Sequence, residues 1–329
     1  MDNVTHSLTG LMMSRALWGR GARGTALMMV LAANAPDLDV VGWFGGSLSY
    51  LQMHRGYTHS LLCAPLVAAV PLLLVRLFAG TQITQARYLA CLGGVLSHLL
   101  MDWTNVYGVR MLLPFSSRWL HLDITDIVDP WIWLILLVAV AAPALSGMVG
   151  SEISSRRVKA PVRGWAKAAL ILLVLFEAGR WVAHARAVGI LESHRFTGMP
   201  PTITAALPGR FAPWNWRGIV ISPGQVYEVP VDLLDDFDPG AGQSYYPVDY
   251  LPEVSLARQT QPFRVFEGFN QLPFWRVTKV LDMNRVELID LRFGTPQTPG
   301  FEAVAEIDAN EAIRESRFGF GPPPITPRP

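Results

Sequence analysis

The sequence predicts an all-α polytopic membrane domain of about five or six helices, some of them short, followed by a small β-rich soluble domain. Hydrophobic residues make up 51% of the 329 residues and charged residues only 16%, which is unusual for a soluble globular protein. The long aliphatic runs stop near residue 187, and the remaining sequence is rich in Pro, Gly and Asp. We therefore expect a helical membrane domain over 1–187, a β-rich domain over 188–320 and an irregular tail over 321–329.

Six apolar segments account for the membrane domain. Residues 60–78 and 130–149 are each about the 20 residues that a helix needs to cross a bilayer. Residues 165–187 form a third candidate, and residues 86–103 have an apolar body with a polar end. Two shorter segments, expected to pack inside the bundle without each spanning fully, are 4–18 and 24–35.

The basic residues indicate which side of the membrane each loop occupies. If the six helices alternate in direction, most Arg and Lys residues of this domain fall on one side, which is then cytoplasmic. The polar residues at the opposite, extracytoplasmic helix ends are His6, Asp37, Asp39, His54, His59, His98, Asp102, His121 and Asp123. We expect a multi-pass protein of the bacterial inner membrane, with the metal site and the C-terminal domain extracytoplasmic.

The second half of the chain has a different pattern. Its short β-prone runs are separated by Pro and Gly turns, as in a small β-rich domain. These runs are RGIVI, QVYEVPV, FRVF, FWRVTKV and RVELIDLRF. The closing residues FGFGPPPITPRP are expected to be irregular.

One helical segment carries a pair of possible metal ligands. In SHLLMD, His98 and Asp102 are four residues apart, so they lie on one helix face and can bind the same ion. Such a pair is more often an ordinary surface pair. In an apolar helix, however, an unpaired aspartate is costly and needs a partner.

Three further segments place ligand-type residues at the same side. HRGYTHS has His54 and His59 on either side of a glycine turn, and NAPDLD presents Asp37 and Asp39 directly after a proline. His6 lies in the first turn of the first helix. Helix caps and solvated loops would explain each segment singly, but not so readily all of them together.

A divalent metal is the simplest common explanation. Mixed His and carboxylate ligands without thiolates suit Zn²⁺ first, with Mn²⁺ or Fe as alternatives, and the number of ligands is enough for two or more ions. A two-metal site with open positions generates hydroxide and holds a phosphoryl or acyl oxygen. The pattern therefore favours hydrolysis.

At these residues the chain resembles the bacterial membrane-bound metal-dependent hydrolases. The family pattern is found as His6 in THSLTG, Asp37 and Asp39 in PDLD, His54 and His59 in HRGYTHS, and His98 and Asp102 in SHLLMD. The resemblance covers roughly residues 1–150 and implies a metal-dependent hydrolase. A more distant similarity, carried mainly by the His-x-x-x-Asp pair, is to zinc-dependent phospholipase C and the P1-type nucleases, whose N-terminal tryptophan ligand has no counterpart here.

The favoured function is a membrane-bound hydrolase, a phosphoesterase acting on a lipid or another membrane-proximal substrate. Beyond the metal ligands, Asp39 could orient a ligand or act as general base, and Asp123 or His121 could do likewise. Arg55 could neutralise a phosphate, although an exposed loop arginine is the more frequent case.

Two alternatives use the same residues differently. In the first, a non-enzymatic membrane protein uses its ions to hold short helices together while the β domain binds a partner. The second alternative is an intramembrane metalloprotease. Such an enzyme is expected to have a His-Glu-x-x-His motif, and this sequence has none. The net charge of +1, without basic blocks, excludes nucleic acid as an expected partner; membrane lipids remain, and no protein partner is indicated.

Overall fold

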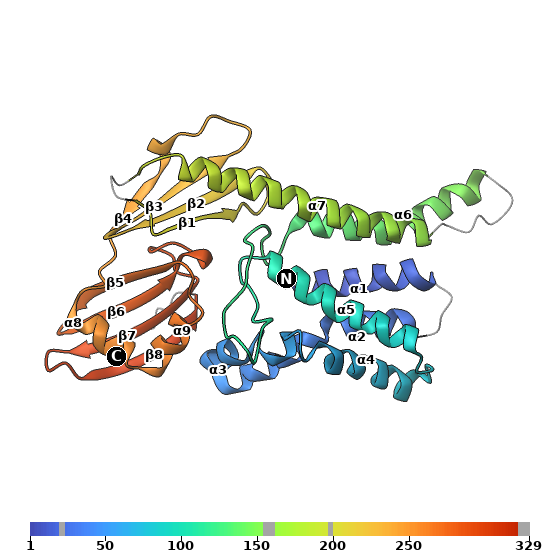
Figure 1. Cartoon of the computed structure of the whole chain (residues 1–329), viewed down its shortest axis with the longest axis horizontal. Helices are drawn as coiled ribbons and strands as arrows, with labels where there is room; N and C mark the ends of the chain where they lie inside the picture. The colour runs from blue at the N-terminus through green and yellow to red at the C-terminus, as the bar shows by residue number, and fades with distance from the viewer. Residues whose placement is uncertain (20–23, 154–161, 197–199, 322–329) are drawn as a thin grey trace. The chain divides into compact units, whose positions relative to one another are not determined.

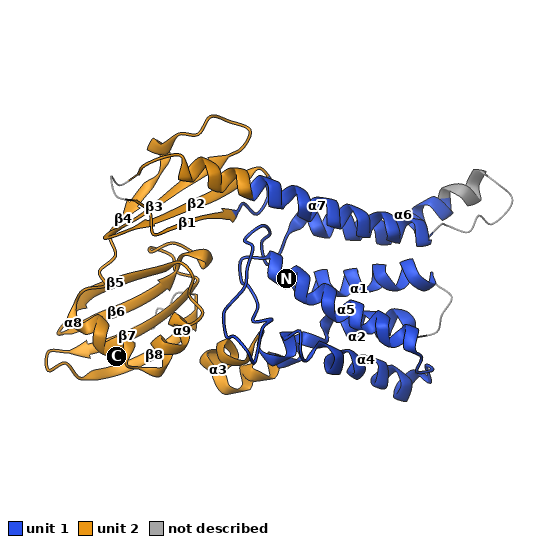
Figure 2. Ribbon diagram, in the orientation of Figure 1, with its two compact units in different colours: residues 1–39, 55–184, 208–213 blue, residues 40–54, 185–207, 214–329 orange. Residues whose placement is uncertain are grey.

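The computed structural model describes residues 1–19, 24–153, 162–196 and 200–321. The chain divides into two compact units, coloured separately in Figure 2. A helical unit comprises residues 1–39, 55–184 and 208–213, and a second, β-rich unit comprises 40–54, 185–207 and 214–329. Each unit is described by itself.

The helical unit is a bundle that brings α1, α2, α4 and α5 together (Figure 1). Its helices are α1 (Asn3–Trp18), α2 (Thr25–Asn34), α4 (Ala64–Ala79), α5 (Gln85–Thr104), α6 (Pro130–Ile153) and the first part of α7 (Val162–Glu192). Gly10 allows α1 to approach α2 closely, because a Cβ at this position would lie 2.5 Å from the carbonyl oxygen of Met29. The close packing of α1 on α2 therefore depends on this glycine.

Two apolar cores hold the bundle together. One lies between α2, α4 and α5 and includes Met29, Leu72 and Leu99. The other lies between α1, α6 and α7 and includes Met12 and Ile132. Both cores include residues of α5, Leu99 in one and Met101 in the other. These apolar contacts thus fix the position of the helix that carries His98 and Asp102.

Three helical stretches of the described chain are long and apolar enough to cross a membrane: Thr25–Met53, Pro130–Met148 and Val162–Glu192. The spans expected at 130–149 and 165–187 are confirmed as such candidates. The expected span at 60–78 is shorter, because α4 begins at Ala64, after a 3-10 turn and bend. Its 16 residues reach about 24 Å, less than the roughly 30 Å of hydrocarbon.

The count of five or six membrane helices and the direction in which they cross stay predictions. Several basic residues on which the expected sidedness depends lie outside the described residues, namely Arg20, Arg23, Arg156, Arg157 and Lys159.

The β-rich unit contains two four-stranded antiparallel sheets, each ordered as in the sequence. The first sheet has β1 (Ile203–Pro208), β2 (Asn215–Ser222), β3 (Gln225–Asp232) and β4 (Gln243–Tyr245). The second has β5 (Pro273–Val280), β6 (Met283–Asp290), β7 (Phe301–Asp308) and β8 (Ile313–Phe320). Three short helices complete the unit: α3 (Gly46–Met53), α8 (Pro252–Arg258) and α9 (Gln261–Glu267).

Two local predictions in this unit are wrong. FRVF is not a strand but part of α9, where Phe263 and Phe266 lie three residues apart on one buried face and Phe266 packs against Phe318 of β8. The first three residues of FGFGPPPITPRP, 318–320, are not irregular, because β8 continues through Phe320 and pairs with β7. Residues 322–329 of the expected tail lie outside the described residues.

Candidate metal centre

Four side chains from three segments converge inside the helical unit. Asp37 lies in the 3-10 helix η1 (Ala35–Gly45) that follows α2, and His59 ends the short 3-10 helix η2 (Tyr57–His59). His98 and Asp102 occupy successive turns of α5, as the four-residue spacing predicts. Each residue offers one ligand atom, and the four atoms all lie within 4.8 Å of one another.

The distances between these atoms match the spacing of ligands around one ion. Nε2 of His59 lies 3.1 Å from Nε2 of His98, and both nitrogens lie 3.3 Å from Oδ2 of Asp102 and 3.5 Å from Oδ1 of Asp37. Neighbouring ligands of a tetrahedral zinc lie about 3.3–3.4 Å apart for bonds of about 2.0–2.1 Å. An octahedral ion places neighbouring ligands at about 3 Å. The four atoms therefore fit a divalent cation, while the spacing leaves its identity open.

The ring of His98 is fixed for metal binding by a backbone group. Its Nδ1 donates a hydrogen bond of 2.7 Å to the carbonyl oxygen of Ala33 at the end of α2. Because a carbonyl can only accept, the proton sits on Nδ1 and the lone pair of Nε2 faces the other ligand atoms. This arrangement is common for histidines that bind metals in proteins.

The ring of His59 is held by Asp39. Oδ2 of Asp39 lies 3.3 Å from Nδ1 of His59 and accepts a 2.9 Å hydrogen bond from the Thr58 hydroxyl, which itself lies 3.1 Å from the same ring nitrogen. The carboxylate therefore sits behind the ring and leaves Nε2 facing the cluster. Within this cluster Asp39 has the position of an orienting residue.

The charges around His59 also change its basicity. Complete burial disfavours the protonated ring, but the close approach of the Asp102, Asp37 and Asp39 carboxylates outweighs this and raises the pKa of His59 to about 10. The carboxylates that stabilise a proton on this ring thus include Asp37 and Asp102, which would also bind a metal. Metal and proton are expected to compete for the site.

Asp102 is contacted from two sides. Its Oδ2 faces the two histidines, while its Oδ1 lies 3.0 Å from a guanidinium nitrogen of Arg55, 3.3 Å from the Asn105 amide and against the backbone nitrogen of Met1. Asp102 is completely buried. Arg55 therefore balances a carboxylate charge that would be costly without a partner.

Arg55 is itself buried and tightly held. Its guanidinium donates to the side-chain oxygen of Asn105 and the carbonyl oxygen of Gly108, and lies 4.5 Å from the ring centre of Tyr107. Its backbone adopts a φ of +54°, which is uncommon for a residue other than glycine, and its amide donates to Asp39. Arg55 thus connects Asp39 and Asp102. Its predicted action on a phosphate stays a prediction.

His6 lies beside the four-residue cluster. Its ring stacks on that of His98 at 3.7 Å between centres, and its Nε2 lies 3.5 Å from Oδ1 of Asp102. The ring is buried, and neither nitrogen has a hydrogen-bond partner among the described residues. Such a histidine suits a further metal ligand that shares Asp102, and this assignment stays a prediction.

The remaining predicted site residues lie outside the four-residue cluster. His54 is the last residue of the 40–54 segment of the β-rich unit, where it is buried and stacks on Tyr50. His121 and Asp123 form a pair at 2.9 Å in the loop between α5 and α6, and Asp123 has a φ of +54°. Neither of this pair belongs to the four-residue cluster. Their predicted roles are not decided by these positions.

The sequence patterns missed one contact of the cluster and one contact beside it. Asn105 links Asp102 and Arg55, and only its place three residues after Asp102 could have indicated it. Glu177 of α7 accepts a 3.4 Å hydrogen bond from Thr104, two residues after Asp102, although it is far away in sequence. No local pattern predicts that contact.

An unsatisfied carboxylate oxygen supports the fit of a cation. Oδ2 of Asp102 is buried and accepts no hydrogen bond within the described ranges, although it faces two ring nitrogens. Buried polar atoms are nearly always satisfied in folded proteins. A metal bound by the two imidazoles and the two carboxylates would satisfy this oxygen.

Together these features define a membrane protein with a buried His/Asp cluster able to bind metal. The comparison with known families agrees with the class: the chain belongs to the YdjM inner membrane protein family, whose model matches residues 1–187. That range includes Asp37, His59, His98 and Asp102 and ends within α7.

The similarity to one curated protein extends over both units. The chain is 25% identical over 333 aligned positions to the uncharacterized protein YfhP of Bacillus subtilis (strain 168), covering 97% of this chain and 95% of the relative. No solved structure matches the chain.

Proposed function

We propose that this protein is a membrane-bound metal-dependent hydrolase, a phosphoesterase that acts on a lipid or another membrane-proximal substrate. The observation that carries the proposal is the convergence of two imidazole nitrogens and two carboxylates at 3.1–3.5 Å inside a membrane protein. Such a set of nitrogen and oxygen ligands is typical of hydrolytic Zn²⁺, Mn²⁺ or Fe sites. The resemblance to membrane-bound hydrolases supports the reaction class.

Asp37, His59, His98 and Asp102 would hold the ion. The Ala33 carbonyl and Asp39 fix the two rings, and Arg55 balances the charge of Asp102. A bound divalent ion would lower the pKa of a water molecule and polarise a phosphoryl oxygen. Asp37 is the most accessible of the four ligands, with 11% of its side chain exposed, so a substrate would approach from its side.

Proton transfer needs a further group within reach of the substrate. In this proposal His6 is either a ligand of a second ion or a proton acceptor, since both of its ring nitrogens lack a partner in the described part of the chain. The His121–Asp123 pair is the other candidate for a general base, because Asp123 holds Nδ1 of His121 and leaves the other ring nitrogen for a substrate.

The setting favours a membrane-proximal substrate. The candidate spans anchor the helical unit in lipid, so lipid head groups would be concentrated near the cluster. The proposal places the cluster and the β-rich unit on the extracytoplasmic side of the inner membrane, in accordance with the bias of the basic residues.

The test combines metal analysis with an activity assay on the full-length protein purified in detergent. Wild type is compared with a His98→Ala, Asp102→Ala double variant. The control is His194→Ala, which changes a histidine of the β-rich unit that contacts Ser193 and does not belong to the cluster. We expect stoichiometric divalent metal and hydrolysis of bis(p-nitrophenyl) phosphate in wild type and His194→Ala, and loss of both in the double variant. Absence of metal from the wild type would contradict the proposal.

A structural metal site is the second candidate, and one observation favours it. Four protein ligand atoms are sufficient to close a tetrahedral shell, and closed shells are typical of structural zinc. Substitution with Co²⁺ separates the two functions. A change in the visible spectrum on addition of phosphate would show an open coordination position, whereas an unchanged tetrahedral spectrum would favour the structural role.

A further inference from the structure

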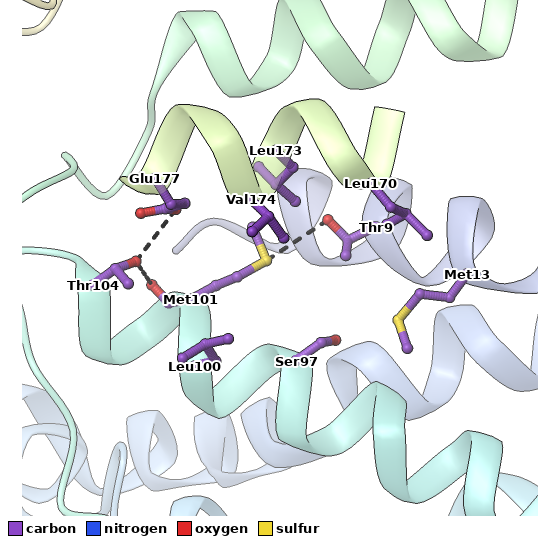
Figure 3. A pocket seen from close by; sticks show the side chains of 10 residues that line it. All are labelled: Thr9, Met13, Ser97, Leu100, Met101, Thr104, Leu170, Leu173, Val174 and Glu177. Atoms are coloured by element: carbon purple, nitrogen blue, oxygen red, sulfur yellow. Dashed lines mark hydrogen bonds between the residues drawn. The ribbon is translucent and has the colours of Figure 1, made fainter. Parts of the chain in front are cut away.

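A cavity of about 350 Å³ lies within the helical unit between α1, α5 and α7 (Figure 3). Its volume is at the lower end of the range found for ligand sites. α5 carries both this cavity and the metal cluster on neighbouring faces, since Ser97 and Met101 line the cavity and are followed directly by His98 and Asp102. The cavity is therefore separate from the cluster but adjacent to it.

The walls of the cavity are mostly apolar. Its floor includes Met101 and Leu173, which are 5% and 6% exposed, and its rim includes Leu100 and Val174, which are 54% and 67% exposed. The cavity thus opens sideways between α5 and α7, while its inner end is buried. Since α7 is a candidate membrane span, an opening beside its rim would face lipid.

A second hollow continues the first along α7. It measures about 320 Å³, is lined by Leu170, Ile171, Val174 and Leu175, and shares two of these residues, Leu170 and Val174, with the cavity. Ile171 and Leu175 are 60% exposed. The cavity and this outer hollow therefore adjoin each other at Leu170 and Val174.

One end of the cavity is polar. Glu177 accepts a hydrogen bond from Thr104 through Oε1, and its buried Oε2 has no hydrogen-bond partner in the described ranges. Figure 3 shows this carboxyl at one end of the cavity and Met13 at the other. A carboxyl inside an apolar bundle needs a hydrogen-bond donor. Thr104, at this polar end of the cavity, lies within one helical turn of Asp102 along α5.

We propose that this cavity binds one acyl chain of a bilayer lipid, which enters sideways past Val174 and Leu100. The chain end lies near Met13, and Glu177 with Thr104 receives a hydroxyl or ammonium donor from the lipid head group. The apolar walls and the adjoining hollow on α7 suit an acyl chain, and the unsatisfied oxygen of Glu177 suits a polar head group.

The binding site stands independently of catalysis. A lipid bound here would place its polar part at the level of Asp102, so it would also be suited as the substrate, and that extension rests on the proposed hydrolase. Binding is therefore measured without turnover, and metal content is measured beside it.

The test is photo-crosslinking of the full-length protein in lipid nanodiscs. The probes are phospholipids with a diazirine at the end of one acyl chain and an ethanolamine or a choline head group; adducts are located by peptide mass spectrometry. We expect adducts at Met13, at the end of the cavity away from Glu177. Adducts confined to the outer surface of α7 and of the other apolar helices would overturn the proposal.

Matched variants test occupancy of the cavity itself. Val174→Trp fills the rim, and the control Leu172→Trp adds the same ring at an exposed position of α7 outside the lining. We expect cavity adducts to fall about tenfold or more in Val174→Trp and to stay unchanged in Leu172→Trp, with metal content equal in both. Leu100→Trp repeats the test from α5 if Val174→Trp does not fold. Unchanged labelling in the folded filling variant would contradict the proposal.

The head-group contact is tested with the two probes. The ethanolamine ammonium can donate hydrogen bonds and the choline group cannot, so the wild type should label more strongly with the ethanolamine probe. Glu177→Leu should remove this preference. Equal labelling of the wild type by both probes would overturn the role of Glu177.

Discussion

The four-residue cluster of the helical unit and the Asp290–Arg292 pair of the β-rich unit bury charged groups in different ways. In the helical unit, His6, His98 and Asp102 are buried together, and both ring nitrogens of His6 and one carboxylate oxygen of Asp102 have no hydrogen-bond partner among the described residues. In the β-rich unit, Asp290 and Arg292 are equally buried, but they neutralise each other through hydrogen bonds of 2.6–3.1 Å.

This difference separates a structural charge pair from a binding site. A fold can satisfy a buried carboxylate with its own arginine, as the β-rich unit does for Asp290. The helical unit supplies Arg55 for one oxygen of Asp102 and directs the other towards two imidazoles. Asp37, His59, His98 and Asp102 can each bind a metal, and their ligand atoms lie at the spacing of ligands around one ion. A bound cation explains this arrangement better than the stability of the fold does.

The largest effect is expected in the β-rich unit. Arg292→Ala should lower the local free energy of unfolding of β5–β8 by about 3–5 kcal/mol, because it leaves Asp290 buried without its partner. Hydrogen exchange of the full chain would measure this. Metal content should be unchanged, and Arg258→Ala, which breaks an exposed pair with Glu267, should cost less than about 1 kcal/mol. A change in metal content in Arg292→Ala would contradict a purely structural role for this pair.

The next effect concerns the residue behind His59. Asp39→Ala should weaken metal binding about 10–100-fold, because it releases a ring that Asp39 and Thr58 hold. Competition with a chelator gives the affinity. Asp126→Ala removes a carboxylate that faces the exposed Arg210 and serves as the control. If Asp39→Ala and Asp126→Ala bind metal equally well, Asp39 does not orient the ligand.

The pH dependence of metal binding should have a defined sign. Burial and the surrounding carboxylates together leave the pKa of His59 at about 10, so the ring is protonated near neutral pH and metal must displace that proton. Apparent affinity should rise about tenfold per pH unit between roughly pH 7 and 9. Calorimetry in buffers of different ionisation enthalpy should record about one proton released from this ring per ion bound. An affinity independent of pH would exclude the competition.

The smallest effect is expected at Glu302 of β7. This carboxyl is 1% exposed, both of its oxygens lack a hydrogen-bond partner in the described part of the chain, and burial with the nearby Glu287 raises its pKa. A raised carboxyl pKa means that the fold loses stability as pH rises above the unfolded value of about 4.3. Glu302→Gln should therefore stabilise β5–β8 at pH 7 by about 1 kcal/mol, with little gain at pH 4. Equal stability of wild type and Glu302→Gln at pH 7 would show that a hydrogen-bond donor satisfies the Glu302 carboxylate in the folded protein in solution.

The sequence predicted much of the helical unit because its signals are local. Continuous apolar runs mark α6 and α7, and a four-residue spacing places His98 and Asp102 on one face of α5. The predictions failed where packing decides the local structure. FRVF has strand-forming residues, but burial of Phe263 and Phe266 on one face selects a helix.

Hydropathy and residue type are sufficient to predict the class of this protein and the chemistry of its candidate metal ligands, because neither depends on neighbours in space. Which ligands meet depends on the tertiary structure, which brings Asp37, His59, His98 and Asp102 together. It also decided the contacts made by the Ala33 carbonyl and by Glu177. Spacing along the chain fixes the positions of side chains only within one helix, and the distances between helices follow from how their apolar faces pack.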